Sequence, residues 1–157
     1  MDNIQINDDL ILRGLEENDF LNYLNLMKEF TNYNYNILYE EFKNNLLFLI
    51  KNKLCFITVI FSKTKNKIIG AGSIFKLIKL HNNPVGQIED VIINNEYRGL
   101  GYGKKIIDIL MQFALKNFNC YKIILNCLEK NVDFYKKCNF TTVGYEMKYN
   151  NNIINNI

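Results

Sequence analysis

The apolar residues of this chain recur with two different periods, and each period predicts a different kind of element. Residues 4–15 alternate between inward and outward positions, which is typical of a strand. Residues 19–30 and 38–51 instead place apolar side chains three or four positions apart, as the buried stripe of a helix requires. Asp19 has the short polar side chain that is favoured at a helix N-cap. One strand followed by two helices is therefore expected.

The next stretch of sequence predicts an antiparallel hairpin. Residues 54–61 are rich in β-branched and aromatic side chains, and residues 62–66 have the composition of a turn. Residues 68–80 are therefore expected to return as the partner strand. The only proline, Pro84, marks a further turn, after which residues 86–93 are expected to form another strand.

Two adjacent acidic residues, Glu89 and Asp90, interrupt this last apolar strand. Neighbouring residues of a regular strand point to opposite faces of a sheet, so the two carboxylates are expected on different faces. A buried carboxylate without a partner is costly in a central strand. The pair is therefore a candidate for contact with amine or hydroxyl groups of a ligand.

An amphipathic helix and a further strand follow. Apolar residues recur at helical spacing on one side of the helix: Ile106, Leu110, Phe113 and Ala114. Residues 121–127 are expected to form a strand, which the helical crossover would place parallel to residues 86–93. A short helix capped near Asn131 and a last strand over residues 141–149 complete the prediction.

Length and composition predict one domain over residues 1–149, with an asparagine-rich tail over residues 150–157. A chain of 157 residues, 48% of them hydrophobic, can bury one core. No stretch reaches the roughly 18 apolar residues of a membrane span, and the polar start is unlike a signal peptide. A cytoplasmic location without membrane contact is therefore expected. The net charge of +3 includes no basic run, which argues against a nucleic-acid partner.

The cysteines and the histidine do not form a recognisable site. The four cysteines, Cys55, Cys120, Cys127 and Cys138, show no CxxC spacing, and His81 is the only histidine. A zinc site and a Cys-His dyad therefore lack their parts, and no metal is expected. Buried free thiols are the better interpretation.

The turn before the amphipathic helix contains three glycines within five positions, Gly99, Gly101 and Gly103. Glycine lets backbone N–H groups approach a ligand closely, and the start of a helix favours negative charge. Together they predict a cradle for a diphosphate group. A Walker A loop needs a glycine where Arg98 stands, and a dinucleotide-binding fingerprint needs one where Lys104 stands. A tight turn without any ligand is the alternative interpretation.

The remaining pattern, Arg98-x-x-Gly101-x-Gly103, resembles the signature of the GNAT superfamily of N-acetyltransferases. Within that superfamily, residues 86–149 are similar to the family of glucosamine 6-phosphate N-acetyltransferases. The similarity is carried by residues 88–91, 99–104, 120–123, 129–132, 134–138 and 146–147. It implies an α/β (α+β) fold of the GNAT type, in which helices flank a mixed central sheet.

The resemblance also implies an activity and its partners. Acetyl-CoA would be the co-substrate, and a small amino-sugar phosphate, D-glucosamine 6-phosphate, would accept the acetyl group directly in a ternary complex on the way to UDP-N-acetylglucosamine. Members of the family are homodimers with shared substrate sites, so a homodimer is expected. Two alternatives stay open: a GNAT enzyme for another small amine or a protein N-terminus, and an acyl-CoA-binding module without activity.

Residue roles follow from the same resemblance. The co-substrate would be bound by the strand edge, the glycine turn and the short helix beyond: Val91, Ile92, Ile93, Arg98, Gly99, Leu100, Gly101, Tyr102, Gly103, Lys104, Asn131 and Tyr135. The catalytic set would comprise Tyr135, Glu89, Asp90 and Asn126, with the Tyr135 phenol protonating the departing thiolate. The sugar phosphate would be bound by Thr31, Lys79, His81, Glu89, Asp90, Tyr121, Lys122, Asn126 and Lys148. A tyrosine that merely packs on the sheet edge is the alternative for Tyr135.

The chain departs from the family pattern at two positions. Asn126 stands where the family usually has a carboxylate, and an amide cannot accept a proton at neutral pH. Asn150 stands where an arginine helps to hold the sugar phosphate, and Lys148 is its nearest substitute despite the opposite strand parity. The general base and the phosphate ligand are therefore left open.

Overall fold

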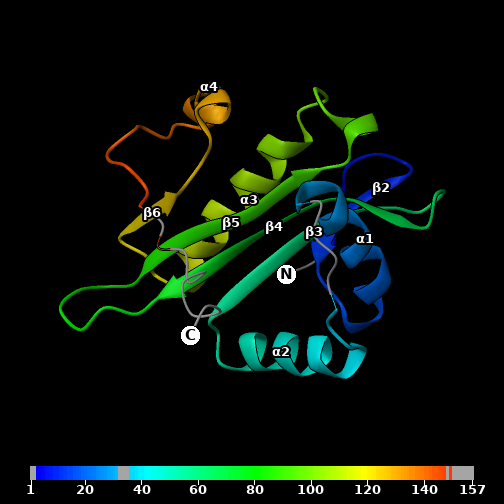
Figure 1. The fold of residues 1–157 in the computed structure, drawn as a ribbon, viewed down its shortest axis with the longest axis horizontal. Helices are drawn as coiled ribbons and strands as arrows, with labels where there is room; N and C mark the ends of the chain where they lie inside the picture. The colour runs from blue at the N-terminus through cyan, green and yellow to red at the C-terminus, as the bar shows by residue number, and fades with distance from the viewer. Residues whose placement is uncertain (1–2, 32–35, 148, 150–157) are drawn as a thin grey trace, which may run out of the picture. The chain divides into compact units, whose positions relative to one another are not determined.

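The computed structural model describes residues 3–31, 36–147 and 149. The chain divides into two compact units, Met1–Leu125 and Asn126–Ile157, and each is described by itself. The first unit is built on a six-stranded sheet whose strands follow the order of the sequence (Figure 1). Its strands are β1 (Ile4–Gln5), β2 (Leu10–Gly14), β3 (Cys55–Ser62), β4 (Lys67–Leu77), β5 (Val85–Ile93) and β6 (Lys122–Leu125).

Neighbouring strands are antiparallel from β1 to β5, and β6 runs parallel to β5. The hairpin expected from the polar turn at residues 62–66 is confirmed as β3 and β4. The parallel pair is confirmed as well, because the helix between its strands carries the chain back across the sheet. This mixed sheet flanked by helices is the predicted GNAT fold.

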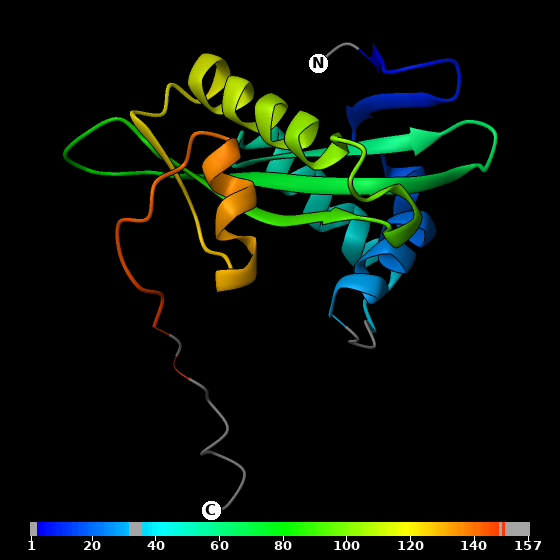
Figure 2. The same cartoon turned by 90° about the horizontal axis from the view of Figure 1, so that it is seen from above.

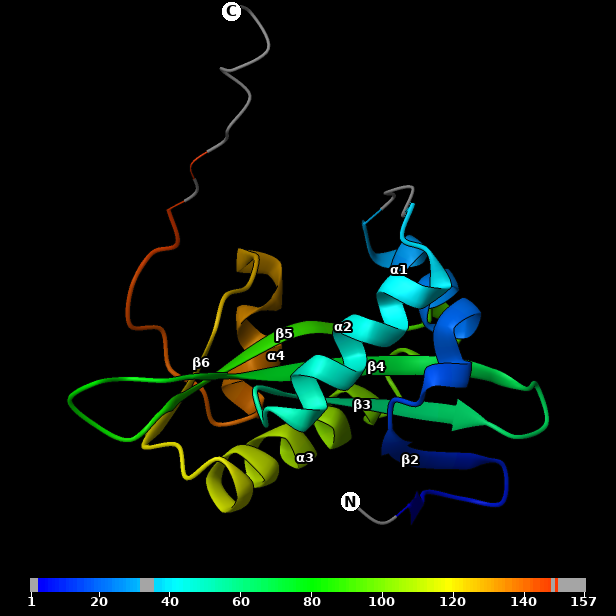
Figure 3. The ribbon, with the colours of Figure 1, turned by 90° about the horizontal axis from the view of Figure 1, so that it is seen from below.

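Three helices cover the two faces of the sheet. Figures 2 and 3 show α1 (Phe20–Thr31) and α2 (Tyr39–Lys51) on one face and α3 (Tyr102–Asn117) on the other. The face under α1 and α2 is closed by a cluster of buried apolar residues: Leu15, Leu26, Met27, Phe42, Leu46, Val59, Ile68, Ala71 and Ile92. The predicted stripe of α3 is buried at Ile106, Leu110 and Ala114.

α3 lies so close to the sheet that the strand beneath it must carry glycine. A β-carbon on Gly72 of β4 would come within 2.6 Å of Ile106 Cγ2 and 3.1 Å of Leu110 Cδ1. No real side chain tolerates the shorter distance without a shift of its neighbours. Gly72 therefore allows α3 to pack this closely on β4.

Two expectations for the N-terminal region are wrong in detail. Residues 4–15 form two strands, because the Asn7 side chain accepts the N–H groups of Asp9 and Leu10 and folds a turn between them. Asp19 does not cap α1. It ends the short 3-10 helix η1 (Glu17–Asp19), where its carboxylate accepts the N–H of Glu16 at 2.9 Å and pairs with Arg13 at 2.6 Å.

The second unit contains η3 (Glu129–Asn131) and α4 (Val132–Lys137), which confirms the predicted short helix. The last strand expected over residues 141–149 is wrong for the part of it that is described, since residues 141–147 enter no strand pair. Their apolar side chains are exposed: Val143 at 88%, Tyr145 at 100% and Met147 at 94%. Alternation alone does not make a strand, because a strand also needs a partner for its backbone groups.

Candidate functional site

The edge of β5 is the first feature of the candidate site. β6 pairs with β5 only from Val85, opposite Lys122, to Ile88, opposite Leu125. From Glu89 to Ile93, β5 is paired with β4 alone among the described strands. The backbone that leads toward the glycine turn therefore has an open edge, to which an extended amide-containing ligand can add like a strand.

A β-bulge lies where this open edge begins. Glu89 pairs with Ser73 and Ile92 pairs with Ala71, so the register shifts by one residue between them. Asp90 has φ of 53°, in the left-handed region. The regular alternation from which opposite faces were expected for Glu89 and Asp90 is interrupted here. A bulge of this kind re-aims side chains, and it does so at the two predicted acids.

The bulge places Asp90 in an environment that disfavours its charge. Burial, and then the neighbouring charge of Glu89, raise the pKa of Asp90 above its ordinary value. Burial, together with the Asp90 charge, raises the pKa of the Cys55 thiol to about 12. The side chain of Glu89 is bound by the Gln87 amide, and its carbonyl accepts the Ser73 hydroxyl at 3.1 Å. The raised pKa makes Asp90 a candidate proton acceptor, and Cys55 stays a neutral thiol.

The glycine turn has the geometry of an open cradle. Gly99 and Gly101 have φ of 79° and 81°, and a β-carbon added to either would meet nothing within 4 Å. α3 starts directly after Gly101, and the start of a helix favours negative charge through its backbone N–H groups and its dipole. The turn therefore fits a diphosphate, which the helix start would stabilise.

The two predicted cations beside the turn are both held by protein groups. Arg98 Nε donates to the Ile93 carbonyl at 3.0 Å. Lys104 Nζ lies 2.9 and 2.8 Å from the two carboxylate oxygens of Asp108, one turn further along α3. Their charges sit at the rim of the turn, with that of Lys104 already balanced in part.

Four of the nine predicted sugar-phosphate residues lie at the other end of β5. Tyr121 and Lys122 stand at the start of β6, beside Val85, and Lys79 and His81 lie in the β4–β5 turn. Val85 and Ile93 are eight residue steps apart along β5, which is about 26 Å at roughly 3.3 Å per residue. The structure therefore does not bring these residues to the glycine turn. The side chain of Thr31, the last residue of α1, and all of Lys148 lie outside the described part of the chain.

The second unit carries the other predicted catalytic residues. Asn126 is exposed, and Asn131 stands at the N-cap of α4 without capping it through its side chain. The half-buried Tyr135 ring packs edge-on against Phe134 and Phe140, with centroid distances of 4.9 and 6.2 Å. This packing holds the ring in place within its own unit. It fits both interpretations of Tyr135, the general acid and the tyrosine that only packs.

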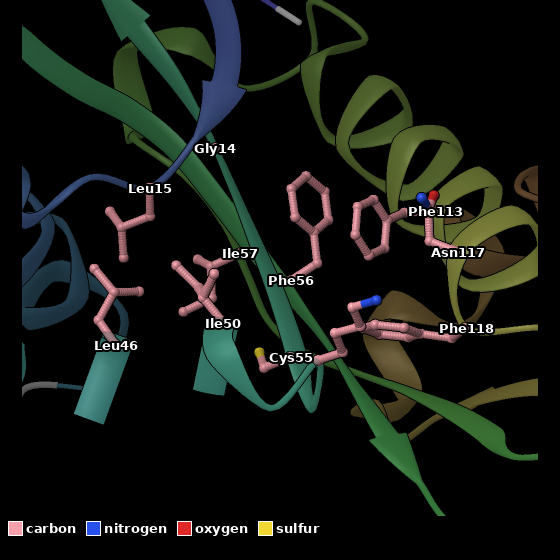
Figure 4. A pocket seen from close by; sticks show the side chains of 11 residues that line it. Gly14, Leu15, Leu46, Ile50, Cys55, Phe56, Ile57, Phe113, Asn117 and Phe118 are labelled. Carbon is pink, nitrogen blue, oxygen red and sulfur yellow. The ribbon is translucent and has the colours of Figure 1, made fainter. Parts of the chain in front are cut away.

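An apolar cavity of about 330 Å³ lies between α2, β3 and α3 (Figure 4). The stacked rings of Phe56 and Phe113 form one wall. Lys53 and Cys55 are the only titratable side chains of its lining. Cys55 is in the same row of the sheet as Phe75 and Gln87, on the side of the bulge away from the glycine turn. Because this lining offers no paired acid and base, the cavity is not a candidate for proton-transfer chemistry.

Two residues that the sequence did not single out fix the start of the glycine turn. Asn94, just beyond β5, is buried, and its amide is bound by Glu29 of α1. The two residues are 65 positions apart, so no local pattern links them. The only sequence signal is an asparagine directly after an apolar strand, which is common in turns.

Metal and membrane features can be judged for the described residues only. Residues 3–31, 36–147 and 149 hold no group of three His, Cys, Asp or Glu side chains that could bind a metal ion. No helix among them is both long enough and apolar enough to cross a membrane. Cys55, Cys120 and Cys138 are buried, whereas Cys127 is exposed.

The sequence was compared with protein families and with curated proteins. A sequence model described as "Acetyltransferase (GNAT) family" matches residues 20–140. Glucosamine 6-phosphate N-acetyltransferase 1 of Dictyostelium discoideum is 46% identical over 84 residues, which cover 52% of this chain and 53% of that protein. Glucosamine 6-phosphate N-acetyltransferase of Trypanosoma brucei brucei is 32% identical over 143 residues, which cover 89% and 95%. This chain therefore spans about half the length of the Dictyostelium relative and nearly all of the trypanosome one.

The fold was compared with solved structures. The crystal structure of glucosamine-6-phosphate N-acetyltransferase from Arabidopsis thaliana superposes with a TM-score of 0.83 at 30% sequence identity. The superposition covers 91% of this chain and 99% of the Arabidopsis chain. The sheet and the helices that position the site are therefore shared with that enzyme.

Proposed function

Because this chain belongs to the acetyltransferase (GNAT) family, we propose that it acetylates the amine of D-glucosamine 6-phosphate with acetyl-CoA, giving N-acetyl-D-glucosamine 6-phosphate. Relatives from a slime mould, a plant and a trypanosome carry that activity in their names. The observation that carries the proposal is the open edge of β5, which begins at the two acids and runs to Ile93, shortly before the glycine turn. This edge leads from Asp90, the proposed proton acceptor, toward the glycine turn, the proposed binding site for an anion.

The co-substrate fits this track by its chemistry. Acetyl-CoA supplies an acetyl group activated as a thioester. The backbone of Val91, Ile92 and Ile93 would bind its pantetheine amides, and the N–H groups of residues 99–104 would bind its diphosphate. The open space at Gly99 and Gly101 leaves room for the phosphate oxygens.

Asp90 is proposed to take the proton from the substrate ammonium, because only a neutral amine has the lone pair that attacks a carbonyl. A carboxylate with a raised pKa holds that proton more strongly than an ordinary one. Glu89, held by Gln87, would bind a sugar hydroxyl or the amine. Asn126 would donate a hydrogen bond without accepting a proton.

The roles expected for residues of the second unit belong to the same proposal. The family match over residues 20–140 spans both units, which supports one catalytic domain over residues 1–149. Tyr135 Oη is proposed as the proton donor for the leaving thiolate, with Asn131 beside the co-substrate. If so, Tyr135→Phe lowers kcat by about 10²-fold or more with little change in either KM.

The sugar phosphate would be held by cations that are remote from the glycine turn of the same chain. Tyr121, Lys122, Lys79 and His81 are gathered at the opposite end of β5, and we propose that they act in a homodimer with shared substrate sites. A cytoplasmic location is part of the same proposal.

A thiol-release assay tests the proposed function. Acetyl-CoA consumption is followed with glucosamine 6-phosphate, with glucosamine, and with a panel of amines and peptide N-termini. We expect efficient turnover with glucosamine 6-phosphate and little with glucosamine, because the phosphate has dedicated cations. Preference for another amine would identify a different GNAT activity. Acetyl-CoA binding without turnover of any amine would indicate a binding module.

A further inference from the structure

The segment that enters the glycine turn is organised by one buried side chain, Asn94. Its backbone N–H donates to the Ile69 carbonyl of β4 at 2.8 Å, and its carbonyl accepts the N–H of Tyr97 at 2.9 Å. Its side-chain oxygen accepts the N–H of Glu96 at 3.2 Å, which caps the short 3-10 helix η2 (Asn95–Tyr97). Asn94 thus ties the end of β5 to the sheet and starts the path toward Gly99.

The other end of the Asn94 amide is held by Glu29. Asn94 Nδ2 lies 3.0 and 2.9 Å from the two carboxylate oxygens of Glu29, near the C-terminal end of α1. Asn94 is only 7% exposed whereas Glu29 is exposed, so this charge-assisted bond is shielded from solvent on the Asn94 side. A carboxylate accepts and never donates at neutral pH, so Glu29 fixes which side of the amide faces the Glu96 N–H.

We propose that Glu29 and Asn94 are positioning residues that hold the glycine turn in the shape that binds the CoA diphosphate. The proposal rests on the proposed function only in requiring that the turn bind CoA. Neither side chain needs to touch the ligand. If the clamp opens, the amide loses its fixed orientation, η2 loses its cap, and the N–H groups of the turn must be reordered when CoA binds.

A second contact on η2 provides an internal comparison. Lys65, in the β3–β4 turn, lies 3.0 Å from Glu96 Oε2 and 5.0 Å from the centre of the Tyr97 ring. Both charged side chains are well exposed, at 49% and 64%, and exposed pairs contribute little. Lys65→Ala should therefore change CoA affinity by less than about twofold.

The test measures CoA binding by calorimetry in the full-length protein. We expect Glu29→Ala to weaken CoA binding by about 10- to 150-fold, the scale of a hydrogen bond to a charged group. Glu29→Gln keeps one acceptor and should lose less than about threefold. Turnover of S-acetylpantetheine, which lacks the diphosphate, should keep its kcat/KM in all these variants. The matched control is Glu17→Ala. Glu17 lies in η1, just before the start of α1, and its carboxylate pairs with Lys43 of α2.

An exchange of the two groups separates positioning from general loss of stability. Asn94→Asp alone places two carboxylates face to face and should weaken CoA binding at least as much as Glu29→Ala. In the double variant Glu29→Gln with Asn94→Asp, the glutamine amide donates to the new carboxylate, which still accepts the Glu96 N–H. We expect its CoA affinity to return to within about threefold of the native protein.

Three outcomes are distinguishable. If the native protein does not bind CoA, the proposed function fails. If it binds CoA and folded Glu29→Ala binds equally well, the clamp has no positioning role. If Glu29→Ala loses CoA affinity and S-acetylpantetheine turnover alike, or if the exchange variant recovers thermal stability without recovering affinity, the clamp acts on the fold and the inference is overturned.

Discussion

Asp90 combines two properties that strand residues usually avoid, a left-handed backbone and a disfavoured charge. Its pKa is raised mainly by burial, so the folded protein holds this proton more tightly than the unfolded chain does. The folded state then binds more protons, and stability falls as pH rises from about 3.9, the ordinary value, through the raised value. Above that interval the charged carboxylate destabilises the native state.

Asp90→Asn removes the charge and keeps a residue type that tolerates φ of 53°. We expect its Tm to exceed that of the native protein at pH 7 and to match it well below pH 4, where both side chains are neutral. Its kcat/KM should fall by about 10²-fold or more, because the proton acceptor is lost. Thermal scans and initial rates check this. If the variant is more stable but keeps the native kcat/KM, then a residue other than Asp90 accepts the proton.

Substitutions at Asn126 test the effect of having an amide where the family usually has a carboxylate. If its amide only donates a hydrogen bond, Asn126→Ala should lower kcat/KM by about 2- to 12-fold, the equivalent of about 0.5–1.5 kcal/mol. Asn126→Asp, which restores the carboxylate usual in the family, should move the acidic limb of the kcat/KM profile to lower pH. A loss of about 10³-fold in folded Asn126→Ala, on the scale of essential proton transfer, would contradict a donor-only role.

Among the elements, the glycine turn gives the sharpest test of the cradle. Gly101 has φ of 81°, which disfavours any L-residue with a β-carbon, and the space beside it is open. Gly101→Ala should therefore weaken CoA binding by about 5- to 30-fold, which corresponds to about 1–2 kcal/mol of backbone strain. Gly144→Ala is the matched control, because Gly144 lacks a left-handed φ and is equally open. Equal CoA affinity for both variants would leave the turn without a ligand role.

Elements that are determined by local spacing and turn composition could be predicted from the sequence. The β3–β4 hairpin and the buried stripe of α3 follow from local spacing and turn composition alone. The bulge at Asp90 could not be predicted, because it depends on how β5 pairs with β4. The Glu29–Asn94 contact was also hidden, since it joins an exposed helix position to a strand end only after both have packed. The last strand failed because alternation does not supply a partner.

For the whole molecule, the exposed segment at residues 141–147 bears on assembly. Its alternate side chains Val143, Tyr145 and Met147 are almost fully exposed, and β6 is the last strand of the described sheet, with an open outer edge. We expect a homodimer at micromolar concentration in sedimentation equilibrium. Val143→Asp with Tyr145→Asp should raise the dimer Kd by at least about tenfold, or 1.4 kcal/mol. Thr142→Asp, at an intervening position, should not. A native monomer would refute the expected dimer and the shared substrate sites together.

The close contact between α3 and β4 limits how the sequence can drift. A methyl group at position 72 would collide with Ile106 Cγ2 at 2.6 Å, and that atom exists only because isoleucine is branched at Cβ. Leucine at position 106 lacks this branch, and the nearest atom to the added methyl group would then be Leu110 Cδ1 at 3.1 Å. The two positions are therefore coupled, and alanine at position 72 should be tolerated better with leucine than with isoleucine at position 106. With isoleucine kept at position 106, the same substitution forces α3 or β4 to shift.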